Sequence, residues 1–528
     1  MPTLYASENE WVYPDIAAPG SEACPLLDCA RGGSVGVQVL TDLVIAENTP
    51  VQLVWENLPQ GVSGKGYRLL PSYVSHNSGK DVFLADNYES VRHFVTRQAP
   101  FEVYDCTLAV EDVLDEAGRL GFYIRFDAAL DAAPGVFDGA AAPVLRVILP
   151  HQTLFFTFAL QLHACCVPPL ENASFHGINW LKTEFMSNRH GVTFPSSEYA
   201  AVLDAYLKDQ IDMRTDYLML PAGDPVLDEN GAVVDFDFSH CVHVGQRALA
   251  AGFNRILGGF VATWITCIDP RLILLWGEQP EVASFEAYAQ LKLYFEKLWK
   301  VINENGWRDC WQQCLVDEPQ FASSEHYRIL ADICRKFLPG IPINDPVESS
   351  DLEGALDVWG VKQAVYEAHI EKFRQLQALG EEIWIYTCGF PAGSMMNRVL
   401  DLPLVVSRLA IWMSVGYGAK GFLHWGYNVC NPDARRDTIF WRKREEGVGL
   451  PPGNGFITYP GKGGPVQSVR GHAQRTGAED AELLWQLTAK DPEAVQAIIA
   501  KVCRGFDDYT PDAAVFDAAR RELLCALD

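Results

Sequence analysis

Eight strand-like apolar segments alternate with helical patterns between residues 172 and 430, and this alternation constrains the fold more than any other feature. The strand-like segments are Ser174–Leu181, Asp216–Leu220, Asn254–Thr263, Asp309–Val316, Ile341–Asn344, Ala355–Trp359, Glu382–Cys388 and Gly421–Trp425. Helical patterns lie between most of them, at Ser196–Asp212, Val282–Glu304, Ser323–Phe337, Gln363–Leu379 and Arg398–Val415. Eight strands in regular alternation with helices predict a (β/α)8, TIM-like barrel.

The segments on either side of this barrel have different patterns. Residues 1–165 contain short β-branched or alternating runs separated by turn-forming residues, for example Val35–Leu40 and Leu120–Phe126. Repeated short strands of this kind predict a β-sandwich. We therefore expect a multidomain α/β and β protein: an N-terminal β-sandwich (1–165), the barrel (172–430) and a C-terminal loop and helical segment that packs on the barrel (431–528).

The charge balance excludes several classes of partner. The chain has 42 Lys and Arg residues against 68 Asp and Glu residues, a formal net charge of −26. Such a field repels nucleic acid and anionic membrane surfaces, so we expect neither as a partner. The N-terminal residues lack the basic and apolar regions of a signal peptide, and no apolar run is long enough to span a membrane. These features predict a cytoplasmic protein; whether it forms a homo-oligomer is left open.

Nothing in the sequence indicates a cofactor or a metal ion. The 14 cysteines show no CxxC pair and no zinc-finger spacing, and most lie in apolar runs, where a free thiol behaves as a small hydrophobe. His240 and His243 could suggest a metal site, but they follow a segment that looks like a helix start. No glycine-rich dinucleotide fingerprint follows a predicted strand. We therefore expect no bound metal and no cofactor.

Two adjacent carboxylates follow the fourth predicted strand. Active sites of such barrels lie at the carboxyl ends of the strands, and the fourth strand ends Cys314-Leu-Val-Asp317-Glu318-Pro319. A carboxylate pair is typical of glycosidic bond cleavage, in which one group protonates the leaving oxygen. Adjacent residues of a strand usually point apart, so the pair fits best when the substrate's own 2-acetamido group is the nucleophile. A pair of solvated acids before a turn is the alternative interpretation.

Aromatic and polar residues end three further strands. The sixth ends at Trp359, the seventh contains Trp384 and Tyr386, and the eighth is followed by Trp425. His424 and Asn428 flank this last aromatic residue. Flat apolar rings beside polar groups suit the C–H faces of a sugar. We therefore expect Tyr386, Trp425, Trp359, Trp384, His424 and Asn428 to bind substrate.

Several landmarks in this order resemble glycoside hydrolase family 123 and its relatives, once catalogued as a domain of unknown function. They are Asp235-Phe-Asp-Phe-Ser239, Cys314-Leu-Val-Asp-Glu-Pro319, Glu382-Ile-Trp-Ile-Tyr-Thr-Cys388, Gly418-Ala-Lys-Gly-Phe-Leu-His-Trp425, Gly455-Phe-Ile-Thr-Tyr-Pro460, Gln467-Ser-Val-Arg470 and Gly477-Ala-Glu-Asp-Ala-Glu-Leu483. The resemblance covers most of the chain. One departure is Ala478, where an aromatic residue is expected.

The resemblance implies an exo-acting, retaining β-N-acetylgalactosaminidase that uses substrate-assisted catalysis. On this basis Asp317 would orient the acetamido group, and Glu318 would be the general acid and base. By analogy with other substrate-assisted barrels, Tyr386 would hold the acetamido carbonyl and Trp425 would form the floor of the pocket. The implied partner is an oligosaccharide or glycoconjugate with a terminal β-linked N-acetylhexosamine. A retaining hydrolase of another β-hexosaminide or of a neutral sugar, and a non-catalytic carbohydrate-binding protein, are the alternatives.

Overall fold

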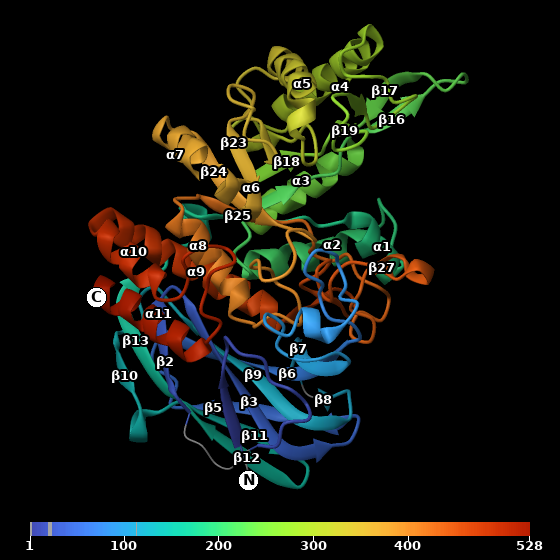
Figure 1. Ribbon diagram of the computed structural model, residues 1–528. Helices are drawn as coiled ribbons and strands as arrows, with labels where there is room; N and C mark the ends of the chain where they lie inside the picture. The colour runs from blue at the N-terminus through green and yellow to red at the C-terminus, as the bar shows by residue number, and fades with distance from the viewer. Residues whose placement is uncertain (1–2, 19–23, 112) are drawn as a thin grey trace. The chain divides into compact units, whose positions relative to one another are not determined.

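The computed structural model describes residues 3–18, 24–111 and 113–528, and the chain in it divides into two compact units (Figure 1). Unit 1 comprises residues 1–175, 388–416 and 426–528, and unit 2 comprises residues 176–387 and 417–425. Unit 1 is therefore built from three separate stretches of the chain. Residues 388–416 and 426–430, which the sequence assigned to the barrel, group with unit 1.

The N-terminal part of unit 1 is rich in β-strands, as the sequence predicts. Its largest sheet has seven antiparallel strands in the order β1-β3-β9-β6-β7-β29-β28. Their bounds are Thr3–Ser7, Ser34–Ile45, Gly118–Ala128, Val62–Val74, Phe101–Ala109, Pro465–Ser468 and Tyr459–Pro460. The last two strands come from the C-terminal stretch, so this sheet joins residues that are far apart in the sequence.

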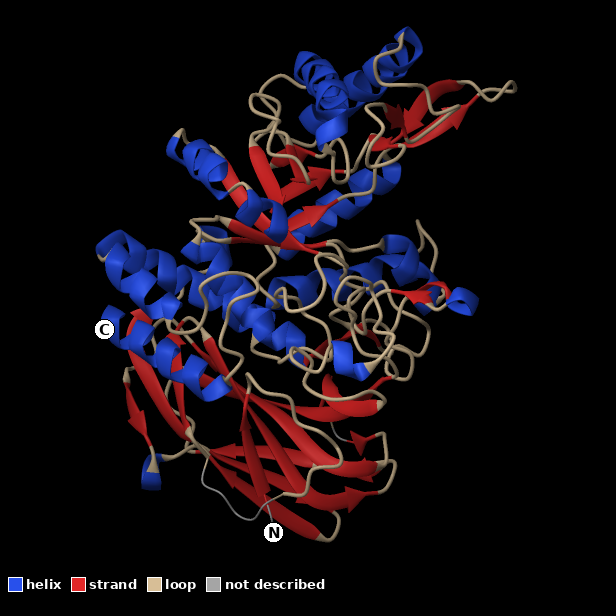
Figure 2. Ribbon diagram, in the orientation of Figure 1, coloured by secondary structure: helices blue, strands red, loops and turns tan. Residues whose placement is uncertain are grey.

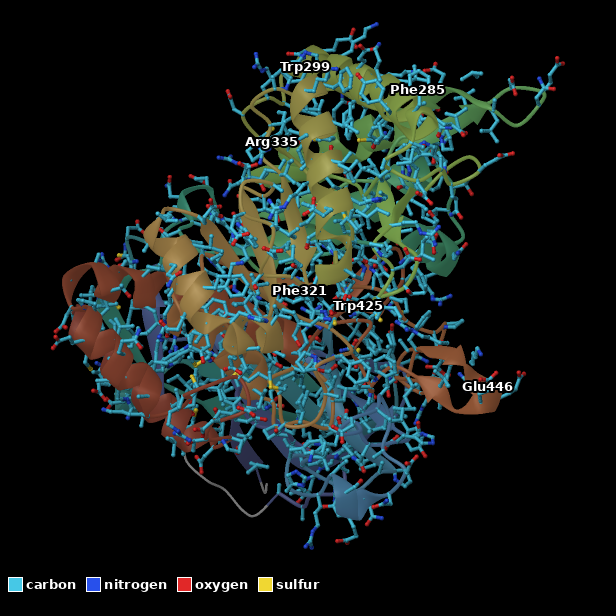
Figure 3. All side chains as sticks on the ribbon, turned by 45° about the horizontal axis from the view of Figure 1, so that its top comes forward. Phe285, Trp299, Phe321, Arg335, Trp425 and Glu446 are labelled. Atoms are coloured by element: carbon cyan, nitrogen blue, oxygen red, sulfur yellow. The ribbon has the colours of Figure 1, made fainter. Side chains whose placement is uncertain are left out.

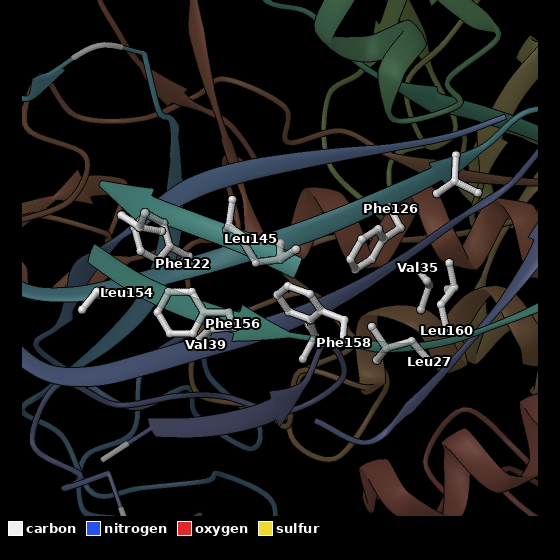
Figure 4. Packing of buried hydrophobic residues seen from close by; sticks show 14 of the residues in the cluster. Leu27, Val35, Val39, Phe122, Phe126, Leu145, Leu154, Phe156, Phe158 and Leu160 are labelled. Atoms are coloured by element: carbon white, nitrogen blue, oxygen red, sulfur yellow. The ribbon is translucent and has the colours of Figure 1, made fainter. Parts of the chain in front are cut away.

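Two three-stranded sheets share a core with this large sheet. They run in the orders β10-β13-β2 (Gly135–Phe137, Ala159–Cys166, Leu26–Arg31) and β12-β11-β5 (Gln152–Thr157, Val144–Leu149, Gln52–Glu56). One apolar cluster contains residues of all three sheets, among them Phe122, Phe126, Leu145, Phe156 and Leu160 (Figure 4). Every second residue of β9, from Leu120 to Phe126, belongs to this cluster, because alternate side chains of a strand lie on the same face. The opposite face of β9 is buried as well, at Tyr123 and Arg125.

Among the described residues of unit 1 there are also four α-helices (Figure 2): α8 (Val406–Gly416), α9 (Val469–Lys490), α10 (Pro492–Ala500) and α11 (Ala513–Leu527). Charged residues connect them in the interior, where Asp480 of α9 accepts hydrogen bonds from Arg408 (2.8 Å) and Arg520 (2.7 Å). Although burial raises the pKa of Asp480, the two guanidinium charges together hold it below its usual value. The landmark Arg470 also has a structural partner, because its guanidinium lies 2.9 Å from the buried Asp105.

Unit 2 contains the eight-stranded parallel sheet that the sequence predicts. In chain order its strands are β14 (His176–Asn179), β15 (Tyr217–Met219), β18 (Arg255–Gly258), β21 (Trp311–Gln313), β22 (Asn344–Val347), β23 (Val358–Lys362), β24 (Glu382–Thr387) and β25 (Gly421–His424). The last strand pairs with the first, and β21 and β22 are joined by a single parallel bridge between Gln313 and Ile343. The sheet is therefore a nearly closed barrel.

Helices connect most of the strands of unit 2. They are α1 (Thr183–His190), α2 (Ser197–Asp212), α3 (Ser239–Ala251), α4 (Phe285–Glu304), α5 (Ser324–Phe337), α6 (Gln363–Ala368) and α7 (Ile370–Ala378). Ser196 caps α2 by accepting a hydrogen bond from the Tyr199 amide. Two hairpins interrupt the alternation, β16–β17 (Asp224–Leu227, Val233–Asp237) and β19–β20 (Ala262–Trp264, Leu272–Leu274).

The connection from β22 to β23 contains turns, and the sequence predicts no helix there either. The helix expected at Arg398–Val415 begins only at Val406. Pro403 explains the late start, because proline disfavours helical geometry in the residue before it and is tolerated only in the first helical turn.

In the part of the chain that the structure describes, no helix is both long and apolar enough to cross a membrane.

Candidate active site

The segment that carries Asp317 and Glu318 is held on both sides after β21 ends. On one side, the buried Asp345 carboxylate accepts hydrogen bonds from the Leu315 amide (2.8 Å) and from the Tyr327 hydroxyl (2.7 Å). On the other side, the Val261 and Ala262 amides donate to the Leu315 carbonyl. These contacts extend the barrel wall beyond β21 and fix the backbone that leads to the carboxylate pair.

Glu318 has an uncommon backbone conformation. Its φ of 52° lies in the left-handed region, which non-glycine residues rarely adopt, and its amide donates to the Pro346 carbonyl (3.1 Å). The turn breaks the alternation that would direct neighbouring strand residues to opposite faces. Backbone strain of this kind is concentrated at functional sites and persists only where surrounding contacts enforce it.

The side chain of Glu318 has two close partners from other strands. The Tyr386 hydroxyl, from β24, donates a 2.6 Å hydrogen bond to Glu318 Oε1. Lys362 Nζ, from the last residue of β23, lies 2.9 Å from the same oxygen. Lys362 also contacts Glu348, the residue that follows β22. Four successive strands therefore contribute to one charged cluster at their carboxyl ends.

Asp317 is exposed to solvent, although protein atoms and charges lie around its carboxyl group. Desolvation by these atoms and the neighbouring charge of Glu318 together raise the pKa of Asp317 to about 7, against the opposing effect of Lys182. The indole of Trp264, in β19, donates a 3.0 Å hydrogen bond to the Asp317 carbonyl and so fixes its backbone. Asp317 can therefore change its protonation state near neutral pH.

The structure places Tyr386 and Trp425 in different surroundings. One O–H group cannot donate to two acceptors at once, so while Tyr386 donates to Glu318 it cannot also donate to an acetamido carbonyl. Trp425 directly follows β25, is only partly buried, and stacks with its neighbour His424 at a ring-centroid distance of 6.4 Å (labelled in Figure 3). His424 itself is fully buried.

Trp359 and Trp384 do not lie with these residues at the strand ends. Trp359 is the second residue of β23, is fully buried, and donates to Glu381. Trp384 is also fully buried, donates to Glu382 at the start of β24 and packs against Tyr217 at the start of β15. Both indoles therefore belong to the amino-terminal half of the barrel, at the opposite end of the strands from Glu318.

Asn428 belongs to unit 1, where it forms an isolated bridge with Phe456. Three residues near the carboxylates escaped the sequence analysis: Lys362, Glu348 and Lys182. Lys362 ends β23 and Glu348 follows β22, but the predicted strands end at Trp359 and Asn344, three and four residues before them. A position at a strand end is the signal that could have identified them. Phe321 was missed as well; it is about half exposed and lies three residues after Glu318 (Figure 3).

No group of three or more His, Cys, Asp or Glu side chains suited to a metal ion occurs within residues 3–18, 24–111 and 113–528. His240 accepts or donates a 2.6 Å hydrogen bond with the Tyr199 hydroxyl, and His243 accepts one from Arg247. Both histidines therefore have partners within the helical layer of unit 2.

Comparisons with known proteins show what this chain is similar to. Residues 274–487, which include both carboxylates, Tyr386 and Trp425, match the family model of the glycoside hydrolase 123 catalytic domain. A search of curated proteins finds no match. Among solved structures, a family 123 glycoside hydrolase from Clostridium perfringens, studied for glycolipid glycan hydrolysis, superposes with a TM-score of 0.74 at 12% identity; the match covers 99% of this chain and 96% of that one.

Two other solved structures are less similar. An endo-β-1,4-mannanase from Thermotoga petrophila has a TM-score of 0.38 at 12% identity, covering 60% of this chain and 78% of that one. A β-D-glucuronidase from Dictyoglomus thermophilum has a TM-score of 0.35 at 10% identity, covering 83% of this chain and 69% of that one. These scores are too low to bear on function. The family match identifies residues 274–487 as a glycoside hydrolase 123 catalytic domain, and the protein is therefore a glycoside hydrolase.

Proposed function

We propose that the protein is an exo-acting, retaining β-N-acetylgalactosaminidase in which the 2-acetamido group of the substrate is the nucleophile. The observation that carries this proposal is the adjacency of Asp317 and Glu318 at one turn, where Glu318 has partners from two other strands and Asp317 is open to solvent. An ordinary retaining enzyme needs two carboxyl groups about 5–5.5 Å apart on either side of the anomeric carbon. The seventh strand, which could have supplied the second one, ends Tyr386-Thr387-Cys388 without a carboxylate.

In the first step Glu318 acts as the general acid. Its carboxyl proton passes to the glycosidic oxygen, the bond from that oxygen to the anomeric carbon breaks, and the leaving group keeps the electron pair. The acetamido oxygen forms a bond to the same carbon at high effective concentration, since it is tethered beside it. Asp317 accepts the amide N–H and stabilises the positive charge of the cyclic oxazolinium that results.

In the second step Glu318 acts as the general base. A water molecule gives up a proton to the Glu318 carboxylate, and its oxygen bonds to the anomeric carbon. The bond from that carbon to the oxazolinium oxygen breaks, which restores the acetamido group. Two displacements at one carbon retain its configuration. Glu318 is protonated again and ready for the next cycle.

The other site residues fit this scheme in different ways. Trp425, partly exposed after β25, offers an apolar ring to the sugar, and the ring of the buried His424 lies 6.4 Å from it, centroid to centroid. We propose that Tyr386 acts on Glu318 and not on the substrate, because its hydroxyl donates a hydrogen bond to that carboxylate. The buried Trp359 and Trp384 receive no role in substrate binding, and Asn428 stays a prediction.

The substrate in this proposal is an oligosaccharide or glycoconjugate with a terminal β-linked N-acetylhexosamine. The matched Clostridium perfringens enzyme acts on glycolipid glycans, which supports a glycoconjugate as the source of that sugar.

A second candidate is a retaining hydrolase of a neutral sugar with a nucleophile of its own. The observation that favours it is Glu348, a third carboxylate that shares the Lys362 ammonium group with Glu318. Against it, Lys362 lies between the two carboxylates, where the anomeric carbon of a substrate would have to be. Glu348 is therefore ion-paired where a free nucleophile would be required.

The decisive experiment is a matched pair of aryl β-galactosides that differ only in carrying a 2-acetamido or a 2-hydroxyl group. We expect turnover to depend on the acetamido group, and a thiazoline mimic of the cyclic intermediate to inhibit. Equal cleavage of the 2-hydroxyl compound would mean that the protein supplies the nucleophile, and Glu348→Gln would then identify it. Glu318→Gln should lose roughly 10²–10⁴-fold on substrates with poor leaving groups, the usual contribution of general acid catalysis.

A further inference from the structure

Lys362 has two carboxylate partners in a nearly buried position. It is only 8% exposed, its ammonium group lies 2.9 Å from Glu318 Oε1, and it contacts Glu348 as well. The same ammonium lies 5.6 Å over the ring of Tyr386. Each of these contacts comes from a different strand end, so the barrel itself determines where the charge lies.

This arrangement differs from the surface ion pairs of the same unit. Lys372 of α7, for example, pairs with Glu353 at 2.6 Å, but its side chain is 35% exposed. Exposed pairs of that kind contribute little, because water screens both charges. A nearly buried ammonium needs a partner at every stage, since leaving a buried charge unpaired is costly.

We propose that Lys362 is the positioning residue for Glu318, and that Glu348 keeps Lys362 paired while Glu318 carries its proton. This inference rests on the proposed role of Glu318 as general acid and base. Lys362 stabilises the Glu318 carboxylate that proton donation creates, and it keeps that carboxylate aimed for the hydrolytic step. Lys362 itself exchanges no proton in either step.

The charges change in a simple way during the cycle. Before the first step Glu318 carries its proton, and the charged carboxylate of Glu348 pairs with Lys362. After the proton has passed to the leaving group, two carboxylates share one ammonium group. The other groups facing this cluster are Asp317 on the same turn and the hydroxyl of Tyr386, with Lys182 near Asp317.

Replacing each member of the pair should shift the pH profile in opposite directions. The alkaline limb of kcat/KM reports loss of the proton from the general acid. Lys362→Met removes a cation beside that acid, so we expect the limb to move to higher pH by about one unit or more. Glu348→Gln leaves the whole ammonium charge to Glu318, so the limb should move to lower pH. Lys362→Arg should restore a profile close to that of the wild type.

The substrate for these profiles is the aryl glycoside that the wild type cleaves fastest, and Lys372→Met is the matched control. The control should leave the profile unchanged. A merely structural ion pair would lower the melting temperature in both variants without opposite shifts of the limb. An unchanged limb in Lys362→Met, or a shift in the same direction in both variants, would overturn the inference. If Lys362→Met does not fold, the inference is tested by the other two variants: the alkaline limb should move to lower pH in Glu348→Gln and should stay close to that of the wild type in Lys362→Arg.

Failure of the proposed function has a different signature. If the wild type cleaves 2-acetamido and 2-hydroxyl glycosides equally, the substrate-assisted mechanism is wrong. The opposite shifts would still show that Lys362 and Glu348 control the general acid.

Discussion

Replacing Tyr386 with phenylalanine tests how the hydroxyl group on β24 contributes to catalysis. In the structure this hydroxyl donates a 2.6 Å hydrogen bond to Glu318. A hydrogen bond to a charged group contributes about 1.5–3 kcal/mol, and about 1.4 kcal/mol corresponds to a tenfold change in rate. If the bond is fully used in the transition state, Tyr386→Phe should lower kcat/KM about 10- to 150-fold.

The assay compares two glycosides of the same N-acetylhexosamine, one with a nitrophenyl and one with an alkyl leaving group. If Tyr386 acts through Glu318, the loss should be large for the alkyl glycoside and small for the nitrophenyl glycoside, which needs little protonation. Equal losses on both substrates would refute this reasoning and place the hydroxyl on the acetamido carbonyl instead. Tyr366→Phe is the matched control, because it removes a buried hydroxyl that bonds to Gln377 and Tyr417 in the same unit.

Three further predictions concern charge and packing. Because the pKa of Asp317 is raised to about 7, its native state holds a proton between about pH 4 and 7 that the unfolded state lacks. The melting temperature of Asp317→Asn should therefore rise relative to that of the wild type as pH increases through this window, and a difference that does not change with pH would contradict this. Wild-type kcat/KM should fall as pH drops below about 7. Trp425→Ala should raise KM with little effect on the melting temperature, whereas Trp384→Ala, which removes a fully buried side chain, should cost about 3–5 kcal/mol of stability. If thermal melts and kinetics show the reverse, Trp384 binds substrate and Trp425 belongs to the core. Asp480→Asn should cost about 3–5 kcal/mol in urea unfolding, since it leaves two buried guanidinium groups without their shared carboxylate, and the exposed Asp508→Asn should leave the unfolding curve unchanged.

The eight barrel strands could be predicted because each is a short apolar run with a clear break after it. The same reading located Asp317 and Glu318 beyond the fourth strand. It could not show that Glu318 adopts a left-handed conformation, because that turn depends on Asp345 and Pro346, which approach it only in the folded barrel. Local sequence specifies strands well, but the contacts that aim a side chain are non-local.

The tryptophans show a second limit. Alternation correctly places Trp384 and Tyr386 on one face of β24, but it says nothing of depth along the barrel axis. Trp384 lies near the start of its strand and Tyr386 near the end, so only Tyr386 reaches Glu318. At β23 the apolar run was ended at Trp359, whereas the strand continues to Lys362. An error of three residues at one strand end concealed the cation of the site.

Unit 1 is built from three separate stretches of the chain, and this affects how it folds during synthesis on the ribosome. Strand β7 is complete about 350 residues before β29, its neighbour in the seven-stranded sheet, is made. At about 5–20 residues per second, the growing chain spends roughly 20 to 70 s with the edge of β7 uncovered. During that interval the edge offers unpaired amide and carbonyl groups to any other extended chain. Nascent chains truncated before residue 459 should therefore bind chaperones, whereas the finished protein, with its edge closed by its own C-terminal stretch, should not.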